Sequence, residues 1–171
     1  LLSAPLRDRF GVSHRMDYYT IENLMDIVLR GAEILGAKTE NDGAFEIAKR
    51  SRGTPRIANR FLKRVRDYSE IRGKGIITQE IAMEALALLG VDELGLDELD
   101  REILNGIIEN YNGGPVGVET MSLLLGEDRR TLEEVYEPYL VKIGFLKRTH
   151  RGRMVTEKGY LHIGKEITVK E

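Results

Sequence analysis

The spacing of the apolar residues constrains the fold of this chain more than any other feature of the sequence. They recur at intervals of three and four residues, and a glycine or a proline ends most of the segments in which they do so. In residues 20–36, for example, Leu24, Ile27 and Val28 share one helical face, Thr20 is a suitable N-cap and Gly36 is a suitable stop. The same reasoning predicts helices over residues 42–49, 55–68, 79–89, 100–110, 118–125, 130–141 and 157–163. Because 42% of the 171 residues are hydrophobic, wholesale disorder is excluded and a mainly α protein is predicted.

A β-hairpin is predicted near the end of the chain. Residues 145–148 form the first strand, residues 149–152 the turn, and Met154 and Val155 begin the return strand. Three helices followed by a hairpin is the order of a winged helix, in which the hairpin is the wing. Residues 91–99 are acidic and turn-like, so they are predicted to form a hinge between this winged helix and the preceding helical unit.

Several classes of protein are excluded by what the sequence lacks. It has no cysteine, which excludes disulfides and thiolate metal sites. No apolar run approaches the roughly 20 residues that span a bilayer, and charges interrupt any signal peptide, so we expect a cytoplasmic protein with no membrane partner. There is no G-x-x-x-x-G-K-[ST] phosphate-binding loop. The histidines His14, His150 and His162 have no metal-ligand spacing, so no metal site is predicted.

The net charge is −2, but many of the basic residues lie in two stretches that contain no acid. Residues 47–66 carry eight lysines and arginines, and residues 138–156 carry five. This favours two anion-binding surfaces, unless counter-charges from elsewhere in the fold leave only solvated faces. Four of the seven wing residues, 147–153, are basic, which favours DNA phosphates over the protein contacts that many winged helices make. A short exposed hairpin rarely needs Arg148, Arg151 and Arg153 for its own stability.

The segment around Arg9 has neither a helical nor a strand period. Arg7 and Arg9 flank Asp8 just before Phe10, and the spacing leaves two interpretations open. In one, the three charges form a self-satisfied ion-pair cluster. In the other, an arginine is presented to a phosphate of a partner, because its planar, permanently charged group suits the charge on a transferring phosphoryl group.

Six segments together resemble one family, the RuvB motors of bacterial Holliday-junction branch migration. They are residues 5–11, 50–60, 90–97, 113–117, 137–140 and 144–149, and they include Pro-Leu-Arg-Asp-Arg-Phe-Gly and Gly-Thr-Pro-Arg. The resemblance covers nearly the whole chain and implies the C-terminal portion of an AAA+ ATPase. Residues 1–20 would be the end of the large ATPase domain, residues 21–91 a small helical AAA+ lid domain, and residues 94–171 a winged-helix DNA-binding head.

The resemblance also implies roles for individual residues. Arg9 matches the arginine finger, which acts on the nucleotide of the neighbouring subunit. Arg56 matches the sensor-2 arginine, which contacts the γ-phosphate, and Tyr19 matches a tyrosine that lines the nucleotide pocket. The head arginines that the family assigns to DNA are matched by Arg129, Arg148 and Arg153. The sequence departs from the family pattern at residues 12–14, which are usually more apolar, and at His150, where proline is usual.

The cofactors and partners implied by the resemblance belong to the complete motor. They are ATP or ADP with Mg²⁺, bound mainly by the large domain, a homo-hexameric ring, double-stranded DNA and the Holliday junction, RuvA contacted through the large domain, and RuvC in the resolvasome. The processes implied are recombination, repair and the SOS response. Without a phosphate-binding loop, the 171 residues should not hydrolyse ATP alone. The alternative is a non-enzymatic winged-helix DNA-binding regulator, in which Arg9 and Arg56 are structural and binding depends on DNA sequence.

Overall fold

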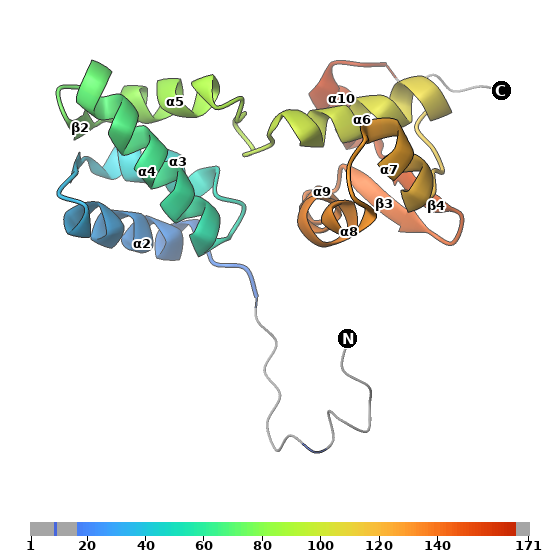
Figure 1. Ribbon diagram of the computed structural model, residues 1–171, viewed down its shortest axis with the longest axis horizontal. Helices are drawn as coiled ribbons and strands as arrows, with labels where there is room; N and C mark the ends of the chain where they lie inside the picture. Colours follow the sequence, from blue (N-terminus) through green and yellow to red (C-terminus); the bar gives the residue numbers. More distant parts are fainter. Residues whose placement is uncertain (1–8, 10–16, 167–171) are drawn as a thin grey trace.

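Two helical lobes lie side by side and are joined by a short linker between helices α5 and α6 (Figure 1). The computed structural model describes residue 9 and residues 17–166. Most of residues 1–20, which are expected to end a large domain, therefore lie outside the described residues, as do residues 167–171 of the expected head.

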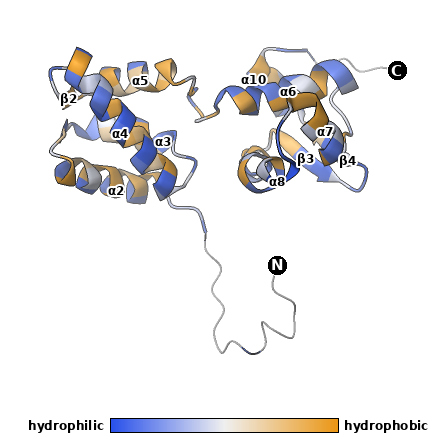
Figure 2. Cartoon of the chain, in the orientation of Figure 1, coloured by the Kyte–Doolittle hydropathy of each residue, from blue (hydrophilic) through white to orange (hydrophobic). Residues whose placement is uncertain are grey.

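The first lobe, which we call the lid lobe, is a four-helix unit. Its helices are α2 (Ile21–Ile34), α3 (Asn41–Lys49), α4 (Pro55–Arg72) and α5 (Gln79–Leu88). The hydroxyls of Thr20 and Thr78 accept hydrogen bonds from the first turns of α2 and α5, as N-cap threonines do. The apolar faces meet in a core that includes Leu24, Ile47 and Leu62. Figure 2 shows the corresponding alternation of apolar and polar residues around the helices.

A two-stranded parallel sheet braces the lid lobe and was not predicted. Strand β1 (Lys38–Thr39) pairs with β2 (Ile76–Ile77), with Lys38 opposite Ile76 and Thr39 opposite Ile77. Strands of two residues are too short to show the alternation by which a sequence indicates a strand. Helix α4 also continues to Arg72, beyond its predicted end at residue 68.

The second lobe, which we call the head lobe, has the predicted winged-helix order. Its first two helices and its hairpin strands are α6 (Glu98–Tyr111), α7 (Val118–Leu125), β3 (Leu146–Thr149) and β4 (Gly152–Val155), and α10 (Glu157–Ile163) ends the lobe. Leu104, Leu140 and Phe145 lie in its core. The predicted fold class, a helical lid followed by a winged helix with a small wing, is confirmed.

The third helix of the head lobe is not the single α-helix predicted over residues 130–141. It consists of α8 (Arg129–Thr131), a π-helical turn η1 (Leu132–Tyr136) and α9 (Glu137–Lys142). Pro138 has no N–H to donate to the preceding turn, and the N–H of Glu137 donates to Leu132 five residues back. The proline therefore explains why the helix changes its register here.

None of the helices in the described part of the chain is both long enough and apolar enough to cross a membrane.

Candidate nucleotide-binding wall and DNA-binding wing

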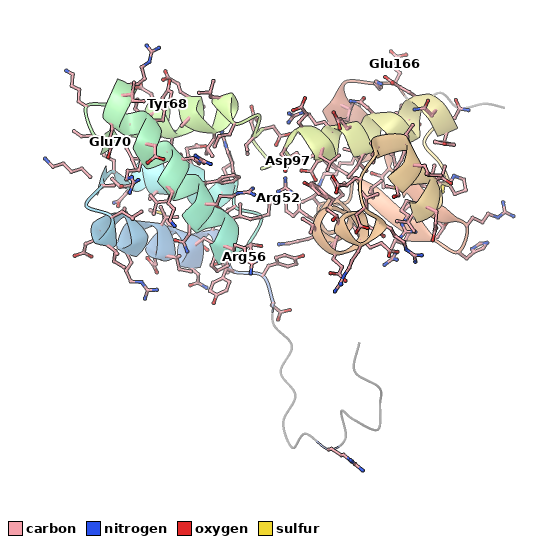
Figure 3. All side chains as sticks on the ribbon, in the orientation of Figure 1. Arg52, Arg56, Tyr68, Glu70, Asp97 and Glu166 are labelled. Carbon is pink, nitrogen blue, oxygen red and sulfur yellow. The ribbon has the colours of Figure 1, made fainter. Side chains whose placement is uncertain are left out.

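Arg56 lies in the first turn of the long helix α4, where it is exposed to solvent. Pro55 takes the first helical position, and the side chain of the N-cap residue Thr54 makes no capping hydrogen bond. The positive end of the helix dipole and the Arg56 guanidinium are therefore close together, an arrangement that attracts phosphate. Figure 3 shows Arg56 at the N-terminal end of α4, beside the segment that precedes α2.

Tyr19 is held next to this helix start by a backbone contact. Its N–H donates to the carbonyl of Gly53 at 3.0 Å, and its side chain is exposed. Gly53 has a φ of +76°, and a Cβ at this position would lie 2.7 Å from the Cβ of Tyr18. Glycine permits both the dihedral angle and the close approach. The glycine of the Gly-Thr-Pro-Arg motif therefore brings Tyr19 to the turn that leads into Arg56, and we call this surface the candidate nucleotide-binding wall.

A cavity of about 470 Å³ lies between this wall and the head lobe. Its lining comes from both lobes and includes Tyr18, Arg56, Arg60, Tyr136 and Tyr139. The Nζ of Lys142 in α9 lies 3.7 Å from the centre of the Tyr18 ring, a cation–π contact. The head lobe therefore contacts the segment that carries Tyr19.

Arg9 is an exposed turn residue, and the residues on both sides of it lie outside the described part of the chain. Its contacts therefore do not test the arginine-finger role or the ion-pair cluster with Asp8. Both stay predictions from the sequence.

The two lobes are joined through a buried arginine that the sequence analysis did not select. Arg52 of the lid lobe donates from Nε to the carbonyl of Gly95 at 2.7 Å and forms an ion pair with Asp100 of α6. A second carboxylate, that of Asp97, lies 3.5 Å from the same guanidinium, and Figure 3 shows Arg52 and Asp97 facing each other between the lobes. The Arg52 guanidinium also lies 5.0 Å from the centre of the Tyr139 ring. Arg52 thus binds the linker and two elements of the head lobe at once.

The backbone at this junction is as constrained as the side chains. Arg52 has a φ of +56°, which a non-glycine residue adopts only where its surroundings hold it. Gly95 has a φ of +80°, and a Cβ there would lie 2.2 Å from the carbonyl oxygen of Arg50. The linker backbone at residue 95 therefore approaches the lid lobe more closely than a residue with a side chain at this position would allow.

Residues 91–99, the expected hinge, are tied to both lobes. The Asp92 carboxylate accepts hydrogen bonds from the linker N–H groups of Leu94 and Leu96 and lies 2.8 Å from Nε2 of His162. Arg101 of α6 donates to the carbonyl of Gly90 at 2.8 Å. The Tyr139 hydroxyl donates to the carbonyl of Leu94. In this structure the linker is thus an anchored connection rather than a free chain.

Burial raises the pKa of Asp100 to about 7, although Arg52 and the N–H of Asp97 act in the opposite direction. The ordinary value in an unfolded chain is close to 3.8, so the folded protein binds this proton more tightly. The contribution of Asp100 to the free energy of unfolding therefore falls as the pH rises from about 4 to about 7.

Two arginines of the wing share one face, against the third helix of the head. Arg148 and Arg153 are directly opposite each other in the β3–β4 register. Arg153 donates from Nε and Nη2 to one carboxylate oxygen of Glu137, at 3.0 and 2.8 Å, and from Nη2 to Glu133 at 2.8 Å. Arg148 is 61% exposed, and its Nε lies 2.7 Å from the other Glu137 oxygen. Arg153, with only 10% of its side chain exposed, therefore has a structural role, which is rare for an arginine in a short exposed hairpin.

Arg129 lies at the start of α8, and its side chain is exposed. It pairs with Glu133 at 3.2 Å and with Glu119 of α7 at 2.5 Å. The three predicted DNA-binding arginines are thus brought together around two glutamates of the third helix. The carboxylates lie outside the acid-free stretch, which explains why the sequence did not indicate them.

Among residue 9 and residues 17–166, no group of three or more histidine, aspartate or glutamate side chains is placed to hold a metal ion.

The fold and these two surfaces define an AAA lid domain followed by a winged helix. Comparison with family models identifies residues 19–92 as the RuvB AAA lid domain and residues 93–164 as the RuvB C-terminal winged helix domain. The chain belongs to the RuvB family.

Curated relatives and a solved structure agree with this assignment. The Holliday junction branch migration complex subunit RuvB of Fusobacterium nucleatum is 71% identical over 170 residues, which cover 99% of this chain and 51% of that protein. The subunit of the same name from Nostoc punctiforme is 58% identical over 163 residues, which cover 95% of this chain and 44% of that protein. The RuvB Holliday junction branch migration motor of Thermotoga maritima superposes with a TM-score of 0.92 at 49% identity. The superposition covers 97% of this chain and 56% of the Thermotoga chain. The chain spans about half the length of the curated relatives that it matches.

Proposed function

We propose that this chain is the lid and head of an ATP-dependent motor that moves Holliday junctions. The observation that carries the proposal is the junction at Arg52, which links the candidate nucleotide-binding wall to the lobe that carries the wing. A change of lid position on nucleotide binding would then reach the wing through packed and ion-paired residues rather than through a loose chain. This is the coupling that a DNA motor needs.

The residues of the wall fit one side of a nucleotide site. Arg56 offers an exposed cation at a helix N-terminus, and Tyr19 offers an aromatic ring beside it. The sequence holds no phosphate-binding loop, so the remaining side must come from the large domain. ATP bound there with Mg²⁺ would supply the phosphoryl group that is transferred to water. Arg56 would contact the γ-phosphate, and Arg9 would place its guanidinium beside the transferring group in the neighbouring subunit.

The charge of the head lobe favours contact with the DNA backbone. The helix that a DNA-binding regulator would place in the major groove begins with Arg129 and Arg130 but also carries Glu133, Glu134 and Glu137, so it offers phosphates no excess of positive charge. The wing next to it carries Lys147, Arg148 and Arg151 instead. Backbone contact of this kind depends on salt and carries no sequence information. We therefore favour the motor over the sequence-specific regulator.

The partners of the complete motor follow from the family. We propose a homo-hexameric ring, because an arginine finger acts across a subunit interface, with RuvA bound through the large domain and RuvC joining at the junction. The proposed location is the cytoplasm.

Binding of the full-length protein to duplex DNA tests the role of the head. We expect duplexes of unrelated sequence to bind within about threefold of each other, and the affinity to fall steeply between about 50 and 200 mM salt. Fluorescence anisotropy with labelled duplexes measures both. A preference of about a thousandfold or more for one sequence is the property of a regulator, and it would contradict the motor.

A further inference from the structure

We propose that Lys142, the last residue of α9, is a positioning residue for the nucleotide: it holds the segment that carries Tyr19 against the candidate nucleotide-binding wall. The inference rests on the proposed function of this wall. Lys142 acts through the ring of Tyr18, and it is not itself a contact residue of the nucleotide.

Helix α9 faces the lid lobe with two side chains three positions apart, those of Tyr139 and Lys142. Residues at this spacing lie on the same side of a helix. The ring centre of Tyr139 lies 5.0 Å from the Arg52 guanidinium, and the Nζ of Lys142 lies 3.7 Å from the ring centre of Tyr18. These are two cation–π contacts of opposite sense, because the head lobe supplies the ring in one and the cation in the other. One face of α9 therefore attaches the head lobe at two neighbouring places.

The contact of Lys142 lies at the turn that leads into Arg56. A Cβ on Gly53 would be 3.2 Å from the Nζ of Lys142 and 2.7 Å from the Cβ of Tyr18, so the ammonium, the ring and the turn are packed together. The carbonyl of Gly53 accepts the N–H of Tyr19 at 3.0 Å. The segment before α2 is thus held by a backbone hydrogen bond at Tyr19 and by the head lobe at Tyr18.

The charge of Lys142 should matter because burial alone holds the ring of Tyr18 weakly. Tyr18 is 48% exposed, and Lys142 is exposed as well. A cation over an aromatic ring at such a site changes an equilibrium constant by about two- to fivefold. Without the contact, the segment would spend less time in the position that places Tyr19 beside Arg56. The apparent affinity for nucleotide falls in proportion to the time for which that position is kept.

Lys142 belongs to the same acid-free stretch as the wing, residues 138–156. The wing, residues 147–153, is proposed to contact DNA, whereas the Lys142 ammonium lies against the ring of Tyr18. One basic stretch thus joins the two ligands of the proposed motor, with DNA-binding charge in the wing and a contact to the candidate nucleotide-binding wall a few residues before it. The charge pattern alone does not separate these two uses.

The affinity of the full-length protein for the β,γ-imido analogue of ATP with Mg²⁺ tests the inference, measured by isothermal titration calorimetry. We expect Lys142→Met, which keeps a side chain of similar length and removes its charge, to raise the Kd by about two- to fivefold. Lys142→Arg should keep the wild-type Kd, because a guanidinium also binds an aromatic face. Tyr18→Leu should raise the Kd as much as Lys142→Met, whereas Tyr18→Phe keeps the ring and should not raise it. Both side chains are exposed, so these variants should fold.

A double variant and a matched control make the test specific to the contact. Lys142→Met combined with Tyr18→Leu should bind no more weakly than either single variant, because both changes remove the same contact. If the two losses add, the residues act independently and the inference is overturned. Lys165→Met removes the same charge from the head lobe, where Lys165 pairs with Glu109, and it should leave the Kd unchanged.

Arg56→Ala separates the inference from the function on which it rests. If Arg56→Ala weakens binding of the analogue and Lys142→Met does not, the wall binds nucleotide without the help of Lys142, and only the inference is overturned. If Arg56→Ala leaves the Kd unchanged, the proposed function of the wall fails first and the inference falls with it.

Discussion

Replacing Arg52 by methionine should lower the free energy of unfolding by about 3–5 kcal/mol at pH 8. Asp100, which has no exposed surface, would lose the guanidinium that stabilises its carboxylate, so the folded variant would have to bind a proton there at a pH at which the unfolded chain does not. The carbonyl of Gly95 would also lose its donor. Methionine has a similar length and no charge, so the packing against Tyr139 is largely kept. Denaturant unfolding of the chain followed by circular dichroism measures the change.

The loss of unfolding free energy in Arg52→Met should depend on pH. Its direction follows from the pKa of Asp100, which is about 7 in the folded protein. Without Arg52 this pKa would rise further, because burial would act unopposed by the cation. Below pH 7 the carboxyl is largely protonated in both proteins, so the charge contribution to the difference is small. Above pH 7 only the wild-type carboxyl ionises readily. The destabilisation should therefore be larger at pH 8 than at pH 6.

Arg130→Met is the matched control for this experiment. Arg130 lies in α8 and pairs with Glu134, but its side chain is 81% exposed. Its replacement should leave the free energy of unfolding nearly unchanged. If Arg52→Met has as little effect as the control, the lobes are not joined by this ion pair. The coupling between wall and wing would then need another route.

Replacing Arg9 by alanine in the full-length protein should reduce ATP hydrolysis by about a thousandfold or more. An arginine finger stabilises charge that develops in the transition state, and the alanine side chain carries no charge to replace it. Because the finger acts in the adjacent subunit, rings mixed from variant and wild-type protein should lose activity at the sites that face a variant subunit. Steady-state phosphate release at a series of mixing ratios measures this.

Two further variants make the Arg9 experiment specific. Arg9→Lys should not restore hydrolysis, since an ammonium group lacks the planar fork of arginine. Arg130→Ala, a change at an exposed arginine of the head, should hydrolyse ATP at the wild-type rate. Wild-type hydrolysis by a homogeneous Arg9→Ala ring would show that Arg9 belongs to an ion-pair cluster instead.

Much of the fold could be predicted because local signals determine it. Thr20 caps its helix as expected, and α7 has the predicted bounds. The hairpin with its turn was also predicted, apart from one or two residues at its ends. These elements depend on apolar spacing, capping residues and glycines, all of which are visible in one sequence.

The contacts between distant residues could not be predicted in the same way. Arg52 and Asp100 are 48 positions apart, and nothing in the local pattern of either residue indicates its partner. Arg153 is assigned to DNA by the family match and by the basic wing, yet Glu137 and Glu133, which lie just before the acid-free residues 138–156, fold back onto it. A charge pattern predicts a binding surface only when the counter-charges supplied by the fold are known.

ATP-dependent movement of a synthetic four-way junction by the full-length protein with RuvA tests the central claim most directly. If this chain is the lid and head of a branch-migration motor, the junction should separate into duplex products with ATP and remain intact with a non-hydrolysable analogue. The rate should be independent of the sequence of the arms, because the wing is proposed to hold the backbone. Failure to move the junction with ATP, together with tight binding to one particular duplex sequence, would contradict the account.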